Sequence, residues 1–159
     1  MKATTLCLLS VWLVMFFPSF LLAAVSPGAV VDAVGYDRGI CVVIGDAECE
    51  FARKLASRSG LTIYMQEPGN DAWEAACRKV DEAGFYGTRI FVGKGPLAQL
   101  HLADNLVDAV VVLSSAVKTP EEELLRVVRP GGTVLLADRK LSKPMPDGVD
   151  DWSHPYHGP

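Results

Sequence analysis

Apolar and polar positions follow two alternating patterns between residues 36 and 138. Short β-branched runs bounded by glycine or polar residues are typical of strands buried on both faces of a parallel sheet. Longer stretches place apolar residues three or four positions apart, which is typical of amphipathic helices. The first pattern predicts strands over residues 39–45, 61–66, 88–93, 106–115 and 133–138, and the second predicts helices over residues 47–60, 70–84 and 119–132.

Helix boundary signals support the helical assignments. Asn70 or Asp71 is expected to cap the second helix, and Gly84 to end it. The third helix is expected to begin with Thr119 as its cap and Pro120 at its first position, with acids in the first turn, arginines in the last turn and glycines after it.

Strands and helices that alternate in this way predict an α/β fold. We expect a doubly wound, mostly parallel, five-stranded Rossmann-like sheet with helices on both faces. A ligand would bind at the C-terminal edge of such a sheet, near Gly45 and the ends of the second and fourth strands.

The N-terminal residues 1–24 have a different character. Lys2 precedes an uncharged apolar run that ends in small residues, which indicates a signal peptide and export to the periplasm or beyond. Leu21 and Leu22 stand where a cleavage site prefers a small residue, so an uncleaved membrane anchor facing outside the cytoplasm is the alternative.

Composition limits the remaining possibilities. The chain has 159 residues, of which 50% are hydrophobic, so it suits one domain, expected over residues 36–139, followed by an irregular linker or tail at 140–159. The net charge of −4 argues against a nucleic-acid partner and limits membrane contact to the N-terminal segment. Cys41, Cys49 and Cys77 lack metal-ligand spacing and are expected to be buried packing residues.

The loop after the first strand is acidic. Only Gly45 is glycine there, while Asp46, Glu48 and Glu50 would repel the pyrophosphate of NAD or FAD. S-adenosylmethionine carries no phosphate and presents a sulfonium and an ammonium, so an acidic loop can favour it. The alternative is that these carboxylates only cap a helix N-terminus.

Two segments carry a resemblance to a known family. "LADNLVDAVVVLSS", followed by "EEELLRVVRPGGTVLLAD", resembles class I S-adenosylmethionine-dependent methyltransferases over roughly residues 39–138. The resemblance implies a cofactor loop at Gly45, Asp46 and Ala47, and an acceptor for the ribose hydroxyls at Gln66 or Glu67. It also aligns Gly95, Pro96 and Leu97 with the segment that contacts adenine, although the usual acid is missing.

The chain departs from this family in ways that bear on activity. Ala47 and Cys49 stand where the family has glycines, and side chains there narrow the approach to a cofactor. Ser114, Ser115 and Lys118 follow the fourth strand without forming a catalytic pattern. The later antiparallel strands of the family are expected to be absent. The sequence therefore leaves open a cofactor-binding domain with weak or no catalysis and a non-catalytic scaffold.

The final residues carry a second resemblance. "GVDDWSHPYHGP" is similar to the join between a methyltransferase-like domain and a β-propeller of pyrroloquinoline-quinone-type repeats in exported bacterial proteins. It implies that this chain is an N-terminal or truncated part of such a protein and that a propeller is its partner, with no quinone bound in this segment. His154 and His157 do not form a metal site by spacing, and Trp152 and Tyr156 suit docking. His101, between two leucines, is expected to be a partly buried packing residue.

Overall fold

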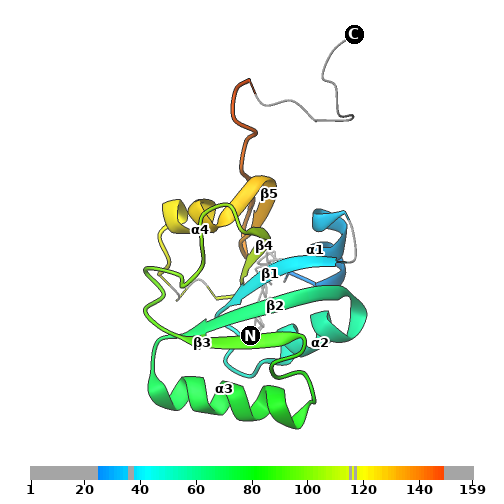
Figure 1. Ribbon diagram of the computed structural model, residues 1–159, viewed down its shortest axis with the longest axis vertical. Coiled ribbons are helices and arrows are strands. Elements are labelled where there is room, and N and C mark those ends of the chain that lie inside the picture. Colours follow the sequence, from blue (N-terminus) through cyan, green and yellow to red (C-terminus); the bar gives the residue numbers. More distant parts are fainter. Residues whose placement is uncertain (1–24, 36–37, 115, 117, 149–159) are drawn as a thin grey trace, which may run out of the picture.

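A single six-stranded sheet organises the chain (Figure 1). The computed structural model describes residues 25–35, 38–114, 116 and 118–148. The strand order is β3-β2-β1-β4-β5-β6, and every neighbouring pair is parallel except β5 and β6. The strands are β1 (Arg38–Ile44), β2 (Gly60–Glu67), β3 (Ile90–Lys94), β4 (Val107–Val112), β5 (Val128–Leu135) and β6 (Lys140–Ser142).

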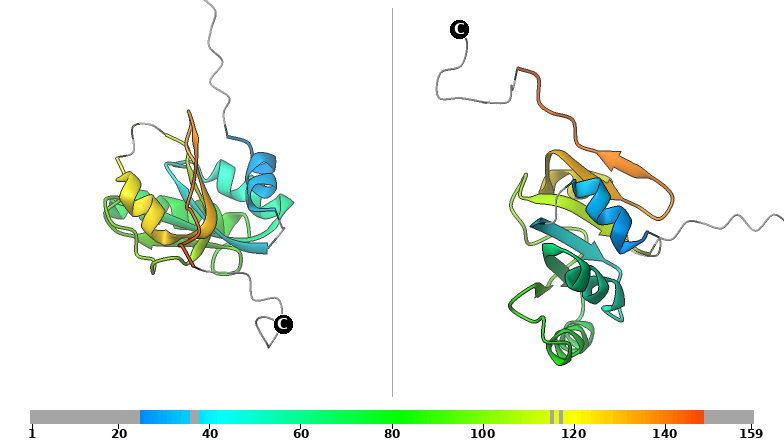
Figure 2. Two further views of the ribbon diagram at one scale, coloured as in Figure 1. Left: turned by 90° about the horizontal axis from the view of Figure 1, so that it is seen from above. Right: turned by 90° about the vertical axis from the view of Figure 1, so that its right-hand side faces the viewer.

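Helices cover both faces of the sheet, as Figure 2 shows. Helices α1 (Pro27–Val34), α2 (Glu50–Arg58) and α3 (Asn70–Glu82) pack on one face, and α4 (Glu121–Val127) packs on the other. Along β1, Cys41 and Val43 join the first core cluster, while Val42 and Ile44 join the second. Burial on both faces explains the continuous apolar run of this strand, because each buried aliphatic side chain contributes about 1.5–3 kcal/mol. The doubly wound parallel arrangement predicted from the sequence is confirmed.

The sheet has one more strand than the five predicted. Strand β6 pairs antiparallel with β5 and lies in the stretch that was assigned to an irregular tail. Its Leu141 packs against the second core cluster. Three residues are too few to show a period in the sequence, so the pattern could not reveal this strand.

Helix α1 was also not predicted. The Ser26 side chain accepts a hydrogen bond from the backbone N–H of Ala29 at 3.2 Å, Pro27 follows at the first position, and Gly35 ends the helix with φ of 81°. These are strong start and stop signals around a short segment. Val30 and Val34 bury their side chains in the first core cluster.

Two of the predicted caps are wrong. Gly69 occupies the cap position of α3, so neither Asn70 nor Asp71 caps it. Pro120 occupies that position in α4, and the Thr119 hydroxyl is buried without a hydrogen-bond partner among the described residues. Helix α4 ends at Val127 because Val128 already pairs with Val107, so the "RPGG" segment belongs to β5.

The "RPGG" segment fixes the join between β4 and β5. Arg129 Nε donates to Asp108 Oδ1 at 2.6 Å, and Asp108 Oδ2 accepts the backbone N–H of Ile40 at 2.8 Å. A Cβ on Gly132 would lie 2.8 Å from the carbonyl oxygen of Asp108, which leaves no room for a side chain. These residues, which carried the resemblance, therefore hold β1, β4 and β5 together.

The outer edge at β3 is largely closed by the chain itself. The Ile90 N–H donates to the Phe85 carbonyl, and the Ile90 carbonyl accepts the N–H of Gly87, both at 3.0 Å. The Trp73 indole N–H donates to the Val92 carbonyl at 3.0 Å. Satisfied edge groups of this kind discourage pairing with another strand.

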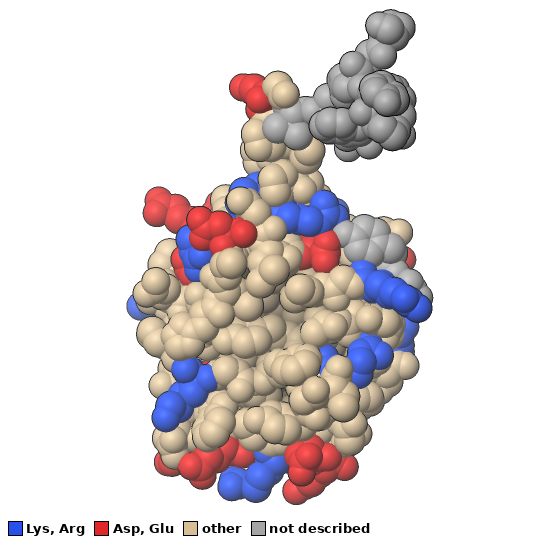
Figure 3. All heavy atoms as spheres, in the orientation of Figure 1, with Lys and Arg blue, Asp and Glu red and all other residues tan. Residues whose placement is uncertain are grey.

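Positive and negative side chains are interspersed around the rim of the face seen in Figure 3, with a broad uncharged centre. Within the part of the chain that the structure describes, none of the helices has the length and apolar character needed to cross a membrane. The predicted signal or anchor at residues 1–24, and the residues singled out between 150 and 159, lie outside the described residues.

Candidate functional site

The parallel strands bring several predicted residues to one edge of the sheet. Strands β2, β1 and β4 are neighbours and end at Glu67, Ile44 and Val112. The Leu113 N–H donates to the Ile44 carbonyl at 3.0 Å, so β1 and β4 stay paired to their ends. Helix α2 leaves β1 on one face and α4 leaves β4 on the other, so the topological switch point lies between these strands.

The turn from Gly45 to Cys49 connects this edge to α2. Gly45 has φ of 81° and Cys49 has φ of 54°, so both lie in the left-handed region. That region favours glycine, and a cysteine there costs conformational energy of order 1–3 kcal/mol. The Cys49 side chain is fully buried, which compensates the strain by packing.

Asp46 has a structural task in this turn. Its side chain is 7% exposed, and Oδ2 accepts the backbone N–H of Ala52 at 2.8 Å. Its carbonyl accepts the N–H of Cys49 at 2.8 Å. The carboxylate therefore satisfies an amide in the first turn of α2, which is the capping role that the sequence left open as an alternative.

Lys79 on α3 holds the outside of the same turn. Its Nζ donates to the Ala47 carbonyl at 3.0 Å and to Glu48 Oε2 at 2.8 Å. A lysine in the middle of an amphipathic helix gives no sequence signal for this contact, and it was not predicted. Lys79 therefore helps to hold the Gly45–Cys49 turn, in which only Gly45 is a glycine.

Gln66 is occupied entirely within the protein. It is 1% exposed, and its Nε2 donates to the carbonyls of Pro96 at 2.7 Å and Gln99 at 2.9 Å. Its Oε1 accepts the Tyr64 hydroxyl at 3.0 Å and the His101 N–H at 2.9 Å. These contacts use the donors and acceptors of the amide, so Gln66 does not present a free group to a ligand.

Glu67 is the remaining candidate of the pair. Successive side chains of a strand face opposite sides, so Glu67 points away from the side that Gln66 occupies. Its side chain is half-buried and accepts no hydrogen bond from the described residues. Burial, followed by the negative charge of Asp46, raises the pKa of Glu67, and Lys79 opposes the shift. The Glu67 carboxylate is therefore available to accept hydrogen bonds from a ligand.

Gly95 and Leu97 lie on the loop that follows β3. The Gly95 N–H donates to the Glu67 carbonyl at 2.9 Å, so this loop begins beside Glu67. Leu97 is half-buried and packs against the second core cluster. The ring of His101 occupies the space where a Cβ on Gly95 would lie. His101 is itself exposed, so its prediction as a partly buried residue is wrong.

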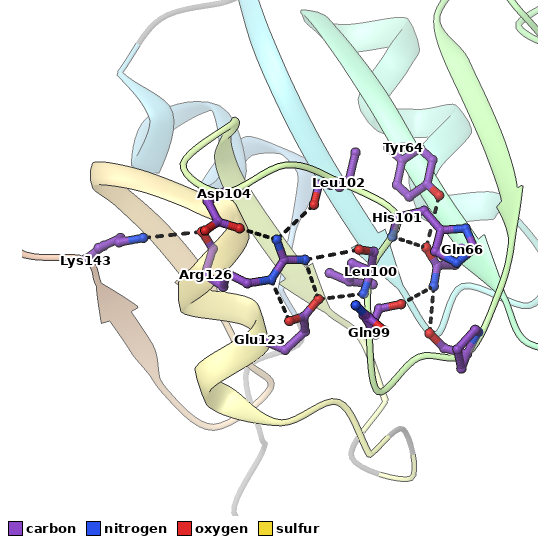
Figure 4. Close-up of polar contacts among 11 residues, drawn as sticks. Tyr64, Gln66, Gln99, Leu100, His101, Leu102, Asp104, Glu123, Arg126 and Lys143 are labelled. Atoms are coloured by element: carbon purple, nitrogen blue, oxygen red, sulfur yellow. Dashed lines mark hydrogen bonds and ion pairs between the residues drawn. The ribbon is translucent and has the colours of Figure 1, made fainter.

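Helix α4 fixes the rest of this loop (Figure 4). Arg126 donates to the carbonyls of Leu100 at 3.1 Å and Leu102 at 3.0 Å, and it pairs with Asp104. Glu123 accepts two hydrogen bonds from Arg126, at 2.7 and 2.8 Å, and the N–H of Leu100 at 2.6 Å. The Arg126 hydrogen bonds lower the pKa of Glu123. Helix α4 thus anchors the loop that begins beside Glu67.

Cys41 and Cys49 are buried thiols. Burial raises the pKa of Cys41 to about 12 and that of Cys49 to about 11, so both are protonated thiols at neutral pH. Cys77 is half-exposed, which differs from the buried position expected for it. None of the described residues forms a group of three or more ligands suited to a metal ion.

The predicted cofactor residues therefore divide into two groups. Gly45, Asp46, Ala47 and Glu67 gather at the C-terminal edge, with Gly95 beside them. Gln66 and Leu97 face the other side of the sheet and serve its packing.

Comparison with solved structures identifies the fold. A proposed S-adenosyl-L-methionine-dependent methyltransferase from Methanococcus maripaludis matches 69% of this chain and 52% of its own, with a TM-score of 0.62 and 21% identity. An S-adenosylmethionine-dependent methyltransferase from Aquifex aeolicus matches 76% of this chain and 66% of its own, with a TM-score of 0.57 and 22% identity. The [4+2]-cyclase SpnF matches 69% of this chain and 42% of its own, with a TM-score of 0.60 and 21% identity.

These likenesses establish that the chain has the Rossmann-like fold of these methyltransferases and of the cyclase. At this level of identity they show the fold alone, and the chain spans less than two thirds of the length of each of these proteins. No family model matches the sequence, and no curated protein matches it.

Proposed function

We propose that this methyltransferase-like domain binds S-adenosylmethionine, or its demethylated product, at the C-terminal edge of β1 and β2. The proposal rests on the Glu67 carboxylate. This group is half-buried, its pKa is raised, and it accepts no hydrogen bond from the described residues. Burying a charged acceptor without a partner costs free energy, which a ligand that supplies donors would recover. Ribose hydroxyls are suitable donors for such a carboxylate.

The charge of the turn supports this ligand over a dinucleotide. In addition to burial, the negative charge of Asp46 raises the pKa of Glu67, and both carboxylates raise the pKa of Cys49, against the opposing charges of Lys79 and Arg53. A pyrophosphate would be repelled here, whereas a sulfonium or an ammonium would be attracted.

We further propose that catalysis is weak or absent. Cys49 and Ala47 replace the glycines of the family loop, and Lys79 holds that loop from outside. The half-buried Ser114 forms no hydrogen bond with the side chain of another described residue, and its hydroxyl accepts the N–H of Ala116 in a local turn at 3.3 Å. The fold also serves a cyclase, so it does not by itself imply methyl transfer.

The test is calorimetric titration of the purified protein with S-adenosylmethionine and, in parallel, with NAD. We expect saturable binding of the first ligand alone, and a loss of at least tenfold in affinity for Glu67→Gln. Glu82→Gln is the matched control, because Glu82 is an exposed glutamate at the far end of α3. Absence of heat in a folded protein, or equal affinity in both variants, would refute the proposal.

A second candidate is a non-catalytic scaffold, and one observation favours it. Asp46 is committed to capping α2, so the acidity of the loop has a structural cause that needs no ligand. This candidate predicts that neither ligand binds and that the domain acts through contacts with a partner.

The cellular setting proposed for either candidate is export, followed in the full protein by a propeller domain. The support is the apolar N-terminal run and the "GVDDWSHPYHGP" segment. Fractionation of cells that express the intact chain, with N-terminal sequencing of the product, tests the export. Recovery of the protein only from the cytoplasm with Met1 retained would contradict it.

A further inference from the structure

A groove lined by basic residues runs along the outer face of α2. It occupies about 420 Å³ between the outer face of α2 and the C-terminal end of α3. Its lining consists of Glu50, Arg53, Lys54, Ser57, Arg58 and Ala83. Residues spaced four apart on a helix lie above one another, so Arg53 and Ser57 form one row and Glu50, Lys54 and Arg58 form the adjacent row.

The groove carries an excess of positive charge on an acidic protein. Three of its side chains are cationic and one is anionic, whereas the whole chain has a net charge of −4. Glu50 is already neutralised by Lys54, with an Nζ–Oε1 distance of 2.6 Å. The two arginines therefore provide the charge that is left for a ligand.

Both arginines have donors to spare. Arg53 uses its Nε on the Cys49 carbonyl at 3.1 Å, which orients the guanidinium and leaves its terminal nitrogens without a partner among the described residues. Arg58 forms no hydrogen bond or ion pair with another described residue. Planar guanidinium groups bind phosphate oxygens in bidentate fashion, and two of them on successive turns suit a tetrahedral dianion.

We propose that this groove binds a phosphate or diphosphate group. The volume lies within the range of small-ligand sites, about 300–1,000 Å³. The groove is open to solvent, so binding is expected to weaken steeply with salt. A phosphorylated small molecule and the headgroup of an anionic lipid share this chemistry. The groove opens on the outer face of α2, whereas the proposed S-adenosylmethionine site lies at the C-terminal edge of the sheet. Arg53 contacts the Cys49 carbonyl of the acidic turn, and the free charge of the groove is supplied by Arg53 and Arg58.

The probe is inorganic pyrophosphate, titrated into the isotopically labelled protein at low ionic strength while amide chemical shifts are followed. We expect saturable shifts confined to residues 50–58 and 83. Arg58→Ala should weaken binding at least tenfold, and it removes no hydrogen bond or ion pair among the described residues. Arg53→Ala should weaken binding similarly, while Arg78→Ala on α3 serves as the control and should change the affinity less than twofold.

A parallel experiment distinguishes the two sources of phosphate. Binding of pyrophosphate without cosedimentation on vesicles that contain phosphatidic acid supports a soluble phosphorylated ligand. Cosedimentation that Arg58→Ala abolishes supports a lipid headgroup. Shifts that do not saturate, or that are equal in Arg58→Ala and Arg78→Ala, would overturn the proposal as general charge screening.

Discussion

Glu67 shows how a single residue can cost stability and serve binding. Its pKa is raised by burial and by Asp46, so the folded state binds the proton more tightly than the unfolded state. Stability therefore falls as pH rises from the unfolded value of about 4.3 to the raised folded value. We expect Glu67→Gln to be more stable than wild type at pH 7 and equally stable below pH 4, as measured by urea unfolding at both pH values. A stability difference that does not depend on pH would contradict this account.

Asp46, unlike Glu67, should stabilise the folded protein. Its buried carboxylate accepts the Ala52 N–H, so Asp46→Lys both removes a cap and buries a cation against the N-terminus of α2. We expect a loss of about 3 kcal/mol in the free energy of unfolding, against about 1 kcal/mol for Asp46→Asn. Chemical denaturation of both variants tests this. Wild-type stability in Asp46→Lys would show that the cap is unimportant.

The sequence could narrow the site to neighbouring residues without choosing between them. Gln66 and Glu67 both lie at the end of β2, and the sequence offers either one as the acceptor for the ribose hydroxyls. The choice depends on which face each side chain occupies, and that follows from the burial of Tyr64 and Met65 in different clusters. Strand alternation is visible in a sequence only where one face is polar, and both faces of β2 are covered.

At the scale of elements, the loop of residues 95–106 depends on helix α4. Glu123 lies on α4, its side chain is 11% exposed, and it holds both Arg126 and the Leu100 N–H. We expect Glu123→Ala to lower the free energy of unfolding by about 2–3 kcal/mol, because the Leu100 N–H loses its acceptor and Arg126 loses one of its two carboxylate partners. Hydrogen exchange should rise across residues 98–105. The neighbouring exposed Glu122 supplies the control, and equal effects of Glu122→Ala and Glu123→Ala would exclude the clamp.

The ion pair of Glu123 and Arg126 should weaken in acid. The lowered pKa of Glu123 means that its contribution is present above the unfolded pKa, about 4.3, and is lost as pH falls through the lower folded value. The wild-type advantage over Glu123→Gln should therefore shrink in acid, which is the reverse of the behaviour expected at Glu67.

Long elements were predictable and their ends were not. The five parallel strands and helices α2 to α4 follow from periodicity, because burial imposes the pattern over many residues. Cap positions failed at Asn70 and Thr119 because a cap depends on the entry angle of the chain, which neighbouring strands set. Strand β6 was missed because its three residues are held in the sheet by pairing with β5 and not by their own strand propensity.

At the scale of the molecule, two features of opposite charge preference adjoin α2: the acidic turn precedes its N-terminus, and the basic groove runs along its outer face to Arg58 at its C-terminal end. The acidic turn at Gly45–Cys49 favours a cation, and the basic groove near Arg58 favours an anion. Each sign complements the charge that the helix dipole carries at that end, so both placements also stabilise α2. Stabilisation of α2 does not account for the Glu67 carboxylate or for the guanidinium nitrogens of Arg53 and Arg58 that lack a partner among the described residues. The two binding proposals depend on these groups.

The extent of the folded unit gives a final prediction. The predicted domain ended at residue 139, yet β6 covers the edge of β5, and Lys143 Nζ donates to Asn105 Oδ1 and to the Leu125 carbonyl, both at 2.6 Å. A chain cut after Arg139 would expose the edge of β5 and the apolar surface that Leu141 covers. We expect it to be less stable than a chain cut after Gly148 by about 3 kcal/mol or more and to self-associate through that edge. Thermal unfolding and sedimentation velocity on both truncations test this, and equal stability of the two would place β6 outside the cooperative unit.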